Sequence, residues 1–291
     1  MTAHDAAHSI GPRRFRNYAF ELTSDDERYV DYLDTLFDAF DPCGPNGSSV
    51  RSIAVLTRGN DRDVGGEDGE DVTIDGELYI REQVRGRAAS TVVHAITRQM
   101  IEASEALGLH AGGVVRHGIG VALPAHMESG KSTLTAGLVR SGFDYLSDEA
   151  VLLDWETHRV IPFPKPISLD PGSWHLFPEL EPQAPLPPGY KDAQWHVPAS
   201  AIRPDSVAGP CRIRYFVFPR YAAGATTRLT PLRRAEATIE LAKNTFRFNE
   251  RPRHSLDALA AEVGDAECFQ LDIGDLETAV ALVSELVEHG R

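Results

Sequence analysis

The segment AHMESGKST, residues 125–133, combines residue types that bind phosphate, and we call it the GKS loop. Gly130 is followed by Lys131 and Ser132, the order found in GxxxxGK[ST] loops, with Ala125 in the first position. In such loops backbone N–H groups surround the phosphates, the lysine ammonium reaches the β- and γ-phosphates, and the hydroxyl ligates Mg²⁺. We therefore predict a nucleotide site. Its expected contact residues are Ala125, Glu128, Ser129, Gly130, Lys131, Ser132 and Thr133.

Two positions of this loop are unusual. Ala125 stands where a glycine normally begins the motif, which costs little if the backbone there avoids positive φ. Glu128 places a carboxylate beside the expected phosphates, which it would repel unless it points outward or toward Mg²⁺. The direction of the Glu128 side chain is therefore the main question that the motif raises.

The segments around the loop have the order that a phosphate loop requires. GIGVALPA (118–125) predicts a strand, KSTLTAGLVRSG (131–142) a helix, and FDYLSDE (143–149) the next strand. The positive end of the helix dipole would then face the bound anion. The alternative is an ordinary turn in which Lys131 and Ser132 only begin a helix.

Acidic residues close the strand that follows the predicted helix. Asp148 and Glu149 end this strand, which places a carboxylate pair beside the γ-phosphate. Asp154 is a second candidate, but AVLLDWETHRVIPF predicts a hairpin that turns between Asp154 and His158. We expect Asp154 to initiate this turn.

The rest of the chain predicts a small α+β N-terminal region at 1–105 and the loop-containing domain at 106–291. Further strands are expected at 18–23, 52–57, 78–84 and 214–221. Helices are expected at 24–40, capped by Ser24, at 88–107, stopped by Gly108, and at 232–244 and 275–289. The proline-rich stretch 177–192 predicts an irregular loop.

Composition narrows the function classes. A net charge of −14 over 291 residues argues against general nucleic-acid binding, which needs clustered Lys and Arg. No long apolar run and no N-terminal signal stretch occur, so we expect a cytoplasmic protein without membrane association. Cys43, Cys211 and Cys268 predict free thiols. The acidic run 58–77 is interpreted as a solvated loop rather than a calcium site, because the fixed acid spacing of calcium loops is missing.

Three segments together resemble a known family. LGLHAGGVV, AHMESGKST and YLSDE occur in the order and at the spacing of the HPr serine kinase/phosphorylase catalytic domain and its HprK-like relatives, which are akin to PEP carboxykinase. The resemblance covers about residues 107–163, and PFPKPISL and FPRY are further features of these relatives. It implies an α/β fold, a P-loop-containing mixed sheet flanked by helices, with the small α+β N-terminal portion before it.

The resemblance also implies roles. Lys131 and Ser132 would hold phosphate and Mg²⁺, Asp148 would orient or deprotonate an acceptor hydroxyl, and Glu149 would bind the metal. His110 would belong to the catalytic surround. ATP or GTP with Mg²⁺ is the implied cofactor, and a homo-oligomer is expected because HPr kinases are oligomers. The family's dephosphorylation signature is not matched, so phosphorylase activity is not expected. The N-terminal region does not match that of the HPr kinases either, so a hydroxyl of a small metabolite or peptide, as in some HprK-like relatives, is the expected acceptor.

Other residues are candidates for substrate contacts. Lys165, Lys191 and Arg220 are basic residues near segments expected to edge the site, where they would complement phosphoryl charge or lie as solvated surface charges. Trp174, Trp195 and Tyr190 would line a pocket or pack in a core. Two alternatives to a kinase remain: a non-catalytic nucleotide-binding scaffold on the same fold, and a plain NTPase.

Overall fold

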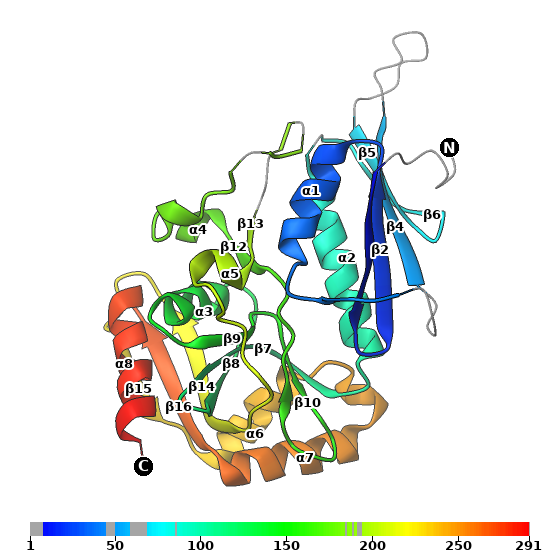
Figure 1. Ribbon diagram of the computed structural model, residues 1–291. Coiled ribbons are helices and arrows are strands. Elements are labelled where there is room, and N and C mark those ends of the chain that lie inside the picture. Colours follow the sequence, from blue (N-terminus) through cyan, green and yellow to red (C-terminus); the bar gives the residue numbers. More distant parts are fainter. Residues whose placement is uncertain are drawn as a thin grey trace. The chain divides into compact units, whose positions relative to one another are not determined.

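The computed structural model describes residues 8–44, 50–58, 69–84, 86–183, 185–187, 189–190 and 194–290. Its contacts form two compact units (Figure 1). The first unit comprises Met1–Glu105 with Ser168–Pro198, and the second comprises Ala106–Ile167 with Ala199–Arg291. The division expected from the sequence, 1–105 and 106–291, differs in the segment 168–198. Half of the acidic run (59–68) and Lys191 lie outside the described residues, and much of the other half forms a strand, Gly69–Ile74, instead of the expected loop.

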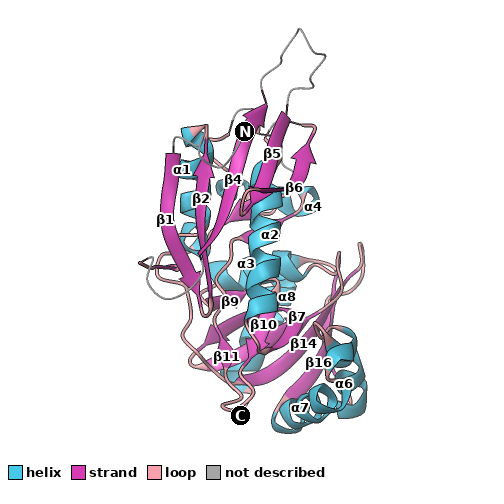
Figure 2. Cartoon of the chain, turned by 90° about the vertical axis from the view of Figure 1, so that its right-hand side faces the viewer, coloured by secondary structure: helices cyan, strands magenta, loops and turns pink. Residues whose placement is uncertain are grey.

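The first unit is built on a six-stranded sheet in the order β3-β1-β2-β4-β5-β6. Its elements are β1 (His8–Phe15), β2 (Tyr18–Ser24), α1 (Glu27–Leu36), β3 (Asp41–Pro42), β4 (Val50–Arg58), β5 (Gly69–Ile74), β6 (Glu77–Glu82) and α2 (Ala88–Ala103). Neighbouring strands are antiparallel except β2 and β4, which are parallel. Figures 1 and 2 show α1 and α2 on the same face of this sheet.

The segment 168–198 belongs to this first unit. Its elements are most of β12 (Ile167–Leu169), α4 (Pro171–Trp174), the 3₁₀ helix η2 (Pro178–Leu180) and β13 (Trp195–Val197). β12 and β13 form a two-stranded sheet. The buried His196 ties this hairpin to α2, because its Nε2 lies 3.0 Å from Ser90 Oγ. Such a contact between residues far apart in sequence explains why the sequence did not assign the segment to the first unit.

Two helix boundaries differ from the expectation. Asp26, not Ser24, caps α1, since its carboxylate accepts the Arg28 N–H, while Ser24 Oγ donates to Val55 O across the sheet. Helix α2 ends at Ala103, and Gly108 lies inside the strand that follows. The helical positions themselves and the strands expected at 18–23 and 52–57 are confirmed.

The second unit is a mixed α/β structure. Its elements are β7 (Leu107–Arg116), β8 (Ile119–Pro124), α3 (Lys131–Arg140), β9 (Asp144–Ser147), β10 (Ala150–Leu153), β11 (Val160–Ile161), α5 (Ala199–Ile202), β14 (Ile213–Tyr221), β15 (Arg228–Pro231), α6 (Arg234–Lys243), the 3₁₀ helix η3 (Phe248–Glu250), α7 (Pro252–Asp265), β16 (Glu267–Ile273) and α8 (Leu276–His289). The strand order is β11-β10-β7-β8-β14-β16-β15, and β9 pairs with β7. β8, β14 and β16 run parallel to one another, whereas β7 is antiparallel to its neighbours.

Helices cover both faces of this sheet. Phe216 and Phe218 of β14 pack in one cluster with Leu241 of α6 and Leu259 of α7. On the opposite face α3 packs against α8 and β7. Side chains alternate between the two faces of a strand, so one sheet supports both layers.

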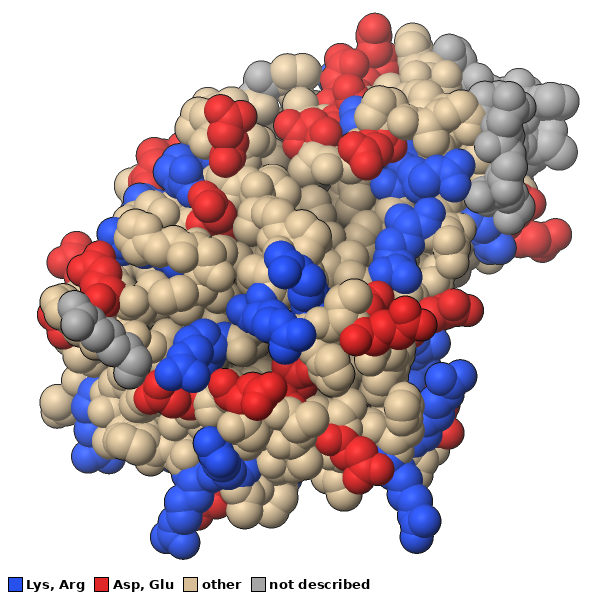
Figure 3. All heavy atoms as spheres, turned by 60° about the horizontal axis from the view of Figure 1, so that its bottom comes forward, with Lys and Arg blue, Asp and Glu red and all other residues tan. Residues whose placement is uncertain are grey.

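The surface charge and the cysteines add two observations. Figure 3 shows one face, where Lys and Arg side chains lie among Asp and Glu side chains rather than in a single continuous patch. All three cysteines are free, and burial raises the pKa of the Cys211 and Cys268 thiols to about 11. Within the described ranges, none of the helices combines the length and the apolar character needed to cross a membrane.

Candidate functional site

The strand β7 brings three predicted site segments together. It pairs with β8 on one side and with β10 on the other. At the ends of these ladders, the Ala125 N–H donates to His110 O (3.4 Å) and the Ala111 N–H donates to Glu149 O (3.1 Å). His110 therefore lies between the start of the GKS loop and the acidic pair.

The GKS loop makes a sharp turn from β8 into α3. Glu128 and Gly130 have left-handed backbones, with φ of 63° and 84°, whereas φ of Ala125 is not positive. Alanine at position 125 therefore introduces no backbone strain. The Tyr221 N–H donates to Ser129 O (3.1 Å), which fixes the loop to the end of β14. The loop conformation thus depends on a strand almost 90 residues further along the chain.

The loop has features of an anion site. Helix α3 begins at Lys131, so its unpaired N–H groups and the positive end of its dipole face the loop. The Ser129 Oγ is buried and has no hydrogen-bond partner. Buried hydroxyls normally have a partner, so an entering acceptor such as a phosphate oxygen would satisfy this one. The residues present therefore fit a phosphate group.

The side chain of Glu128 is exposed to solvent. This exposure answers the question that the motif raises: the Glu128 carboxylate lies toward the solvent. The left-handed backbone at this position is the conformation that a glycine adopts at little cost, whereas a residue with a Cβ pays roughly 1 kcal/mol. Glu128 is thus a strained position as well as a charged one.

Lys131 and His110 form a hydrogen-bonded pair. The Lys131 Nζ lies 2.6 Å from His110 Nε2, and the lysine is only 7% exposed. Burial lowers the pKa of both groups, and the neighbouring Lys131 ammonium lowers the pKa of His110 further. A neutral imidazole that accepts a hydrogen bond from the ammonium fits both shifts. His110 also packs edge to face against Phe246, with ring centroids 5.8 Å apart.

The two acidic residues differ in their surroundings. Asp148 is 1% exposed, and its Oδ1 accepts hydrogen bonds from Lys165 Nζ (2.7 Å) and from the Tyr145 hydroxyl (3.1 Å). Lys165 is 3% exposed and also donates to Pro166 O (2.7 Å). Burial raises the pKa of Tyr145 well above its usual value, and the Asp148 carboxylate adds to this effect, so the phenol stays a donor.

Glu149, in contrast, lies toward the solvent. Its side chain is 36% exposed, and its Oε1 is 3.5 Å from His110 Nε2. The turn that separates it from β9 is fixed by Ser147, whose Oγ accepts the backbone N–H groups of Glu149 and Ala150. Ser132 and Thr133, at the start of α3, are half-buried. Glu149 is therefore the accessible member of the acidic pair.

Several other candidates contact partners outside this cluster. Arg220 and Arg228 both bind the carboxylate of Asp272, so Arg220 has a structural partner. In the first unit Trp174 stacks on Trp195, with ring centroids 4.6 Å apart, and the hydroxyl of Tyr190 is hydrogen-bonded to that of Tyr32. Asp154 accepts the N–H groups of the hairpin turn, as expected.

Sequence reasoning missed Tyr145, Phe246 and Tyr221 as parts of the site. Tyr145 and Tyr221 appear in the sequence only as strand residues of ordinary apolar patterning. Phe246 lies in the segment after α6, which pairs with β7 through the Phe246 N–H and Gly108 O (2.8 Å). The contacts of Tyr221 and Phe246 depend on pairing with distant segments, so no local pattern signals them. Tyr145 contacts Asp148 only three residues further along, but its apolar strand pattern does not show that its hydroxyl turns toward this carboxylate.

Comparison with solved structures gives a weak likeness, whereas comparison with family models and curated proteins gives none. No protein-family model and no curated protein matches the chain. Among solved structures, the chain is similar to one described as the Hpr(Ser) kinase/phosphatase from Coxiella burnetii, with a TM-score of 0.31 and 10% sequence identity. The match covers 63% of this chain and 95% of that chain. A TM-score this low does not establish a common fold, so the functional argument depends on the geometry described above.

The buried ion pair gives a stability prediction. Lys165→Met should lower the free energy of unfolding by about 3 to 5 kcal/mol, because it leaves the Asp148 carboxylate buried without its cation. The double variant Lys165→Met with Asp148→Leu should recover much of this loss. Urea denaturation measures both. The control is Lys243→Met, whose exposed pair with Glu240 should matter by less than about 1 kcal/mol; an equal loss in both lysine variants would refute the prediction.

His110 gives a pH prediction. Its pKa is lowered from the ordinary 6.5 in the folded state, so the unfolded chain binds the proton first. The resulting stabilisation is complete above about pH 6.5 and is lost as the pH falls through that value toward the lowered pKa. Urea denaturation at about pH 7.5 and about pH 5.5 should therefore show a smaller loss of stability in His110→Gln than in the wild type. The exposed His94→Gln is the control, and an unchanged loss in His110→Gln would contradict the assignment.

Proposed function

We propose that this protein is a phosphotransferase that binds ATP or GTP with Mg²⁺ at the GKS loop and transfers the γ-phosphoryl group to a hydroxyl of a small metabolite or peptide. One observation carries the proposal: within a single unit, a strand, a glycine-lysine-serine turn and a helix place the buried Lys131 next to His110 and an acidic pair. Phosphoryl transfer needs positioning and charge stabilisation more than covalent chemistry, and these groups supply both.

Lys131 has the role of neutralising phosphate charge. Its ammonium is held by His110 before any ligand enters and has few contacts with water. A phosphate oxygen is a stronger acceptor for an ammonium than a neutral imidazole, so it would replace or share His110 as the partner. The N-terminal N–H groups of α3 add partial positive charge at the same place. His110 would then act as a positioning residue that orients the Lys131 ammonium.

The proposed Mg²⁺ ion would have few protein ligands. Among the described residues, no group of three or more His, Cys, Asp or Glu side chains could hold a metal. Mg²⁺ in phosphoryl-transfer sites commonly uses one or two protein ligands together with phosphate oxygens and water. Ser132 and Glu149 would hold it here. When bound, the ion would neutralise charge that develops on the transferring group.

The acceptor hydroxyl would be oriented or deprotonated by Asp148, as the family resemblance implies. For this role Asp148 must reach the acceptor, although its Oδ1 is held by Lys165 and Tyr145. Lys165 would therefore act as a positioning residue that keeps the carboxylate ionised and oriented. Its ammonium would also add positive charge near Lys131, whose pKa is lowered mainly by burial and further by the Lys165 charge.

A second function, nucleotide binding without catalysis, is favoured by the burial of Asp148. A carboxylate that is 1% exposed does not contact solvent-borne ligands in this conformation. A scaffold of this kind would bind a nucleotide at the GKS loop and transfer nothing. A plain NTPase, the third possibility, would release phosphate without an acceptor, at a rate that Asp148→Asn barely changes.

The test is phosphate transfer from labelled ATP·Mg²⁺ or GTP·Mg²⁺ to a panel of hydroxyl metabolites and serine-ended peptides. Wild type should label an acceptor, and Lys131→Ala should lower the rate at least about a hundredfold, because it removes the cation that stabilises transferring charge. The control is the exposed Lys243→Ala. Equal transfer by the wild type and Lys131→Ala refutes the proposal, and nucleotide binding by calorimetry without transfer supports the scaffold.

Glu128 gives a second prediction on the same site. Glu128→Gly should bind ATP·Mg²⁺ a few-fold to about tenfold more tightly, because it removes a negative charge beside the phosphates and a left-handed Cβ. Glu128→Ala is the matched variant, since it removes the charge but retains the strained backbone. Calorimetry of both variants separates the two causes. Weaker binding by both would show that the carboxylate helps to hold the metal instead.

A further inference from the structure

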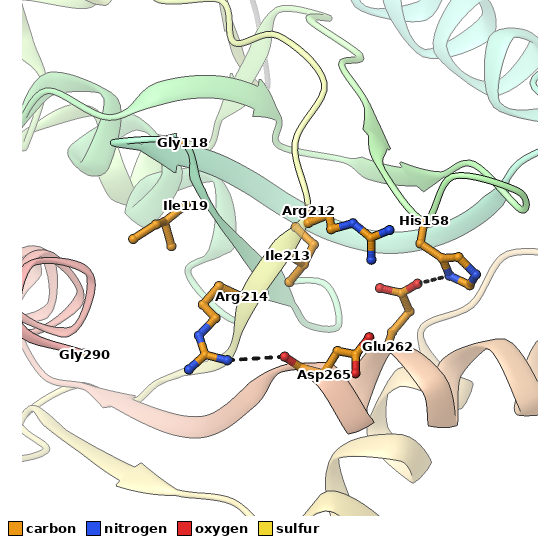
Figure 4. Close-up of a pocket in the computed structure, with 9 residues that line it drawn as sticks. All are labelled: Gly118, Ile119, His158, Arg212, Ile213, Arg214, Glu262, Asp265 and Gly290. Carbon is orange, nitrogen blue, oxygen red and sulfur yellow. Dashed lines mark hydrogen bonds and ion pairs between the residues drawn. The ribbon is translucent and has the colours of Figure 1, made fainter.

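A cavity lined by charged and apolar residues lies in the same unit as the GKS loop, at the opposite end of the sheet. Its volume is about 550 Å³ (Figure 4). Ile119 and Ile213, which begin β8 and β14, line it, whereas the GKS loop follows the other end of β8. The six residues of β8 span about 17 Å, so the two sites are separate.

Two arginines and two carboxylates line this cavity. Arg212 and Arg214 are two residues apart where the chain enters β14, and Glu262 and Asp265 are one turn apart on α7. Gly118 also lines the cavity, and a Cβ built there would meet no atom within 4 Å. The cavity is therefore bounded by a strand that supplies cations and a helix that supplies carboxylates.

These charges do not neutralise one another directly across the cavity. Arg212 donates to the carbonyl of Thr157 (3.2 Å). Arg214 pairs with Glu267 (2.9 Å) outside the lining set and also donates to the backbone carbonyl, not the carboxylate, of Asp265 (3.4 Å; Figure 4). Over the described part of the chain, no ion pair joins Arg212 to Glu262 or to Asp265. The strand therefore presents positive charge and the helix negative charge to the space between them.

Glu262 is a buried carboxylate in the wall of the cavity. It is only 8% exposed, and its Oε1 is 2.6 Å from Nδ1 of His158. His158 itself has a left-handed backbone (φ 55°) at the turn of the hairpin between β10 and β11. Figure 4 shows the other carboxylate oxygen of Glu262 directed toward the cavity. A desolvated carboxylate of this kind gains from an ammonium group that reaches it.

We propose that this cavity binds a small zwitterion, an α-amino acid or a dipeptide. The ligand carboxylate would bind Arg212, its ammonium would bind Glu262 and Asp265, and its side chain would lie against Ile119 and Ile213. A simple anion is disfavoured by the two carboxylates, and a simple cation by the two arginines. The volume lies within the range of about 300 to 1,000 Å³ that is usual for small-molecule sites.

The test is calorimetry of the intact protein with the natural amino acids and a set of dipeptides. Each compound that binds is compared with its N-acetyl and its carboxamide derivatives, which lack one of the two charges. Loss of either charge should weaken binding at least about tenfold. Free amino acids and dipeptides are separate arms, so the preferred size follows from the same experiment. No binding by any compound at millimolar concentration refutes the proposal, and so does binding that survives N-acetylation.

Variants locate the site. Arg212→Gln and Glu262→Gln should each weaken binding at least about tenfold, while the exposed Arg233→Gln, outside the cavity, should have no effect. Lys131→Ala should retain binding, which separates this site from the GKS loop. Thermal melts identify any variant that fails to fold, and Glu262→Asp then serves as a second, more conservative probe of the ammonium contact. Equal affinity in the wild type and both cavity variants overturns the assignment.

Discussion

The hydrogen bonding of β7 on both of its edges is the constraint on which the candidate site depends. Because β7 is antiparallel to β8, to β9 and to β10, its residues near His110 meet the end of β8 on one side and the start of β10 on the other. The GKS loop and the acidic pair are 24 residues or fewer apart in sequence, but without β7 nothing would hold them around one side chain. The local order of strand, turn and helix is necessary for the site, and the pairing of β7 completes it.

Close packing of α3 on β7 follows from the same arrangement. A Cβ built at Gly112 would lie 2.5 Å from Thr135 Oγ1 and 3.4 Å from Lys131 Cγ. At Gly113 it would lie 2.9 Å from Val151 on the opposite side of the strand. Adjacent glycines therefore let a helix approach one face and a neighbouring strand residue approach the other. This approach keeps the stem of Lys131 against the sheet, so that its ammonium points along the strand ends to His110.

The sequence predicted the parts of the second unit whose cause is local. The helix from Lys131 follows from its apolar spacing, and the hairpin turn at Asp154 from an Asx turn. β16 was not predicted, because its partner β14 lies about 50 residues earlier in the chain, and α7 was not predicted, because its apolar pattern is weak. For the same reason the motif identified Asp148 and Lys165 as separate candidates but not as one buried ion pair. A salt bridge across 17 residues leaves no trace in local periodicity.

Asp148 and Glu149 differ in burial, and this difference separates their roles. Lys131 and Lys165 balance Asp148 and Glu149 before any ligand arrives, and three of these four groups are less than a tenth exposed. If a triphosphate binds as proposed, Lys131 would accept its negative charge only by sharing or leaving His110. Lys165 has no such freedom, because it is bound to Asp148 and to the carbonyl of Pro166. The more exposed Glu149, whose Oε1 lies 3.5 Å from His110 Nε2, is therefore the carboxylate that the proposed ligand would affect, and Asp148 is the one whose position the fold already fixes.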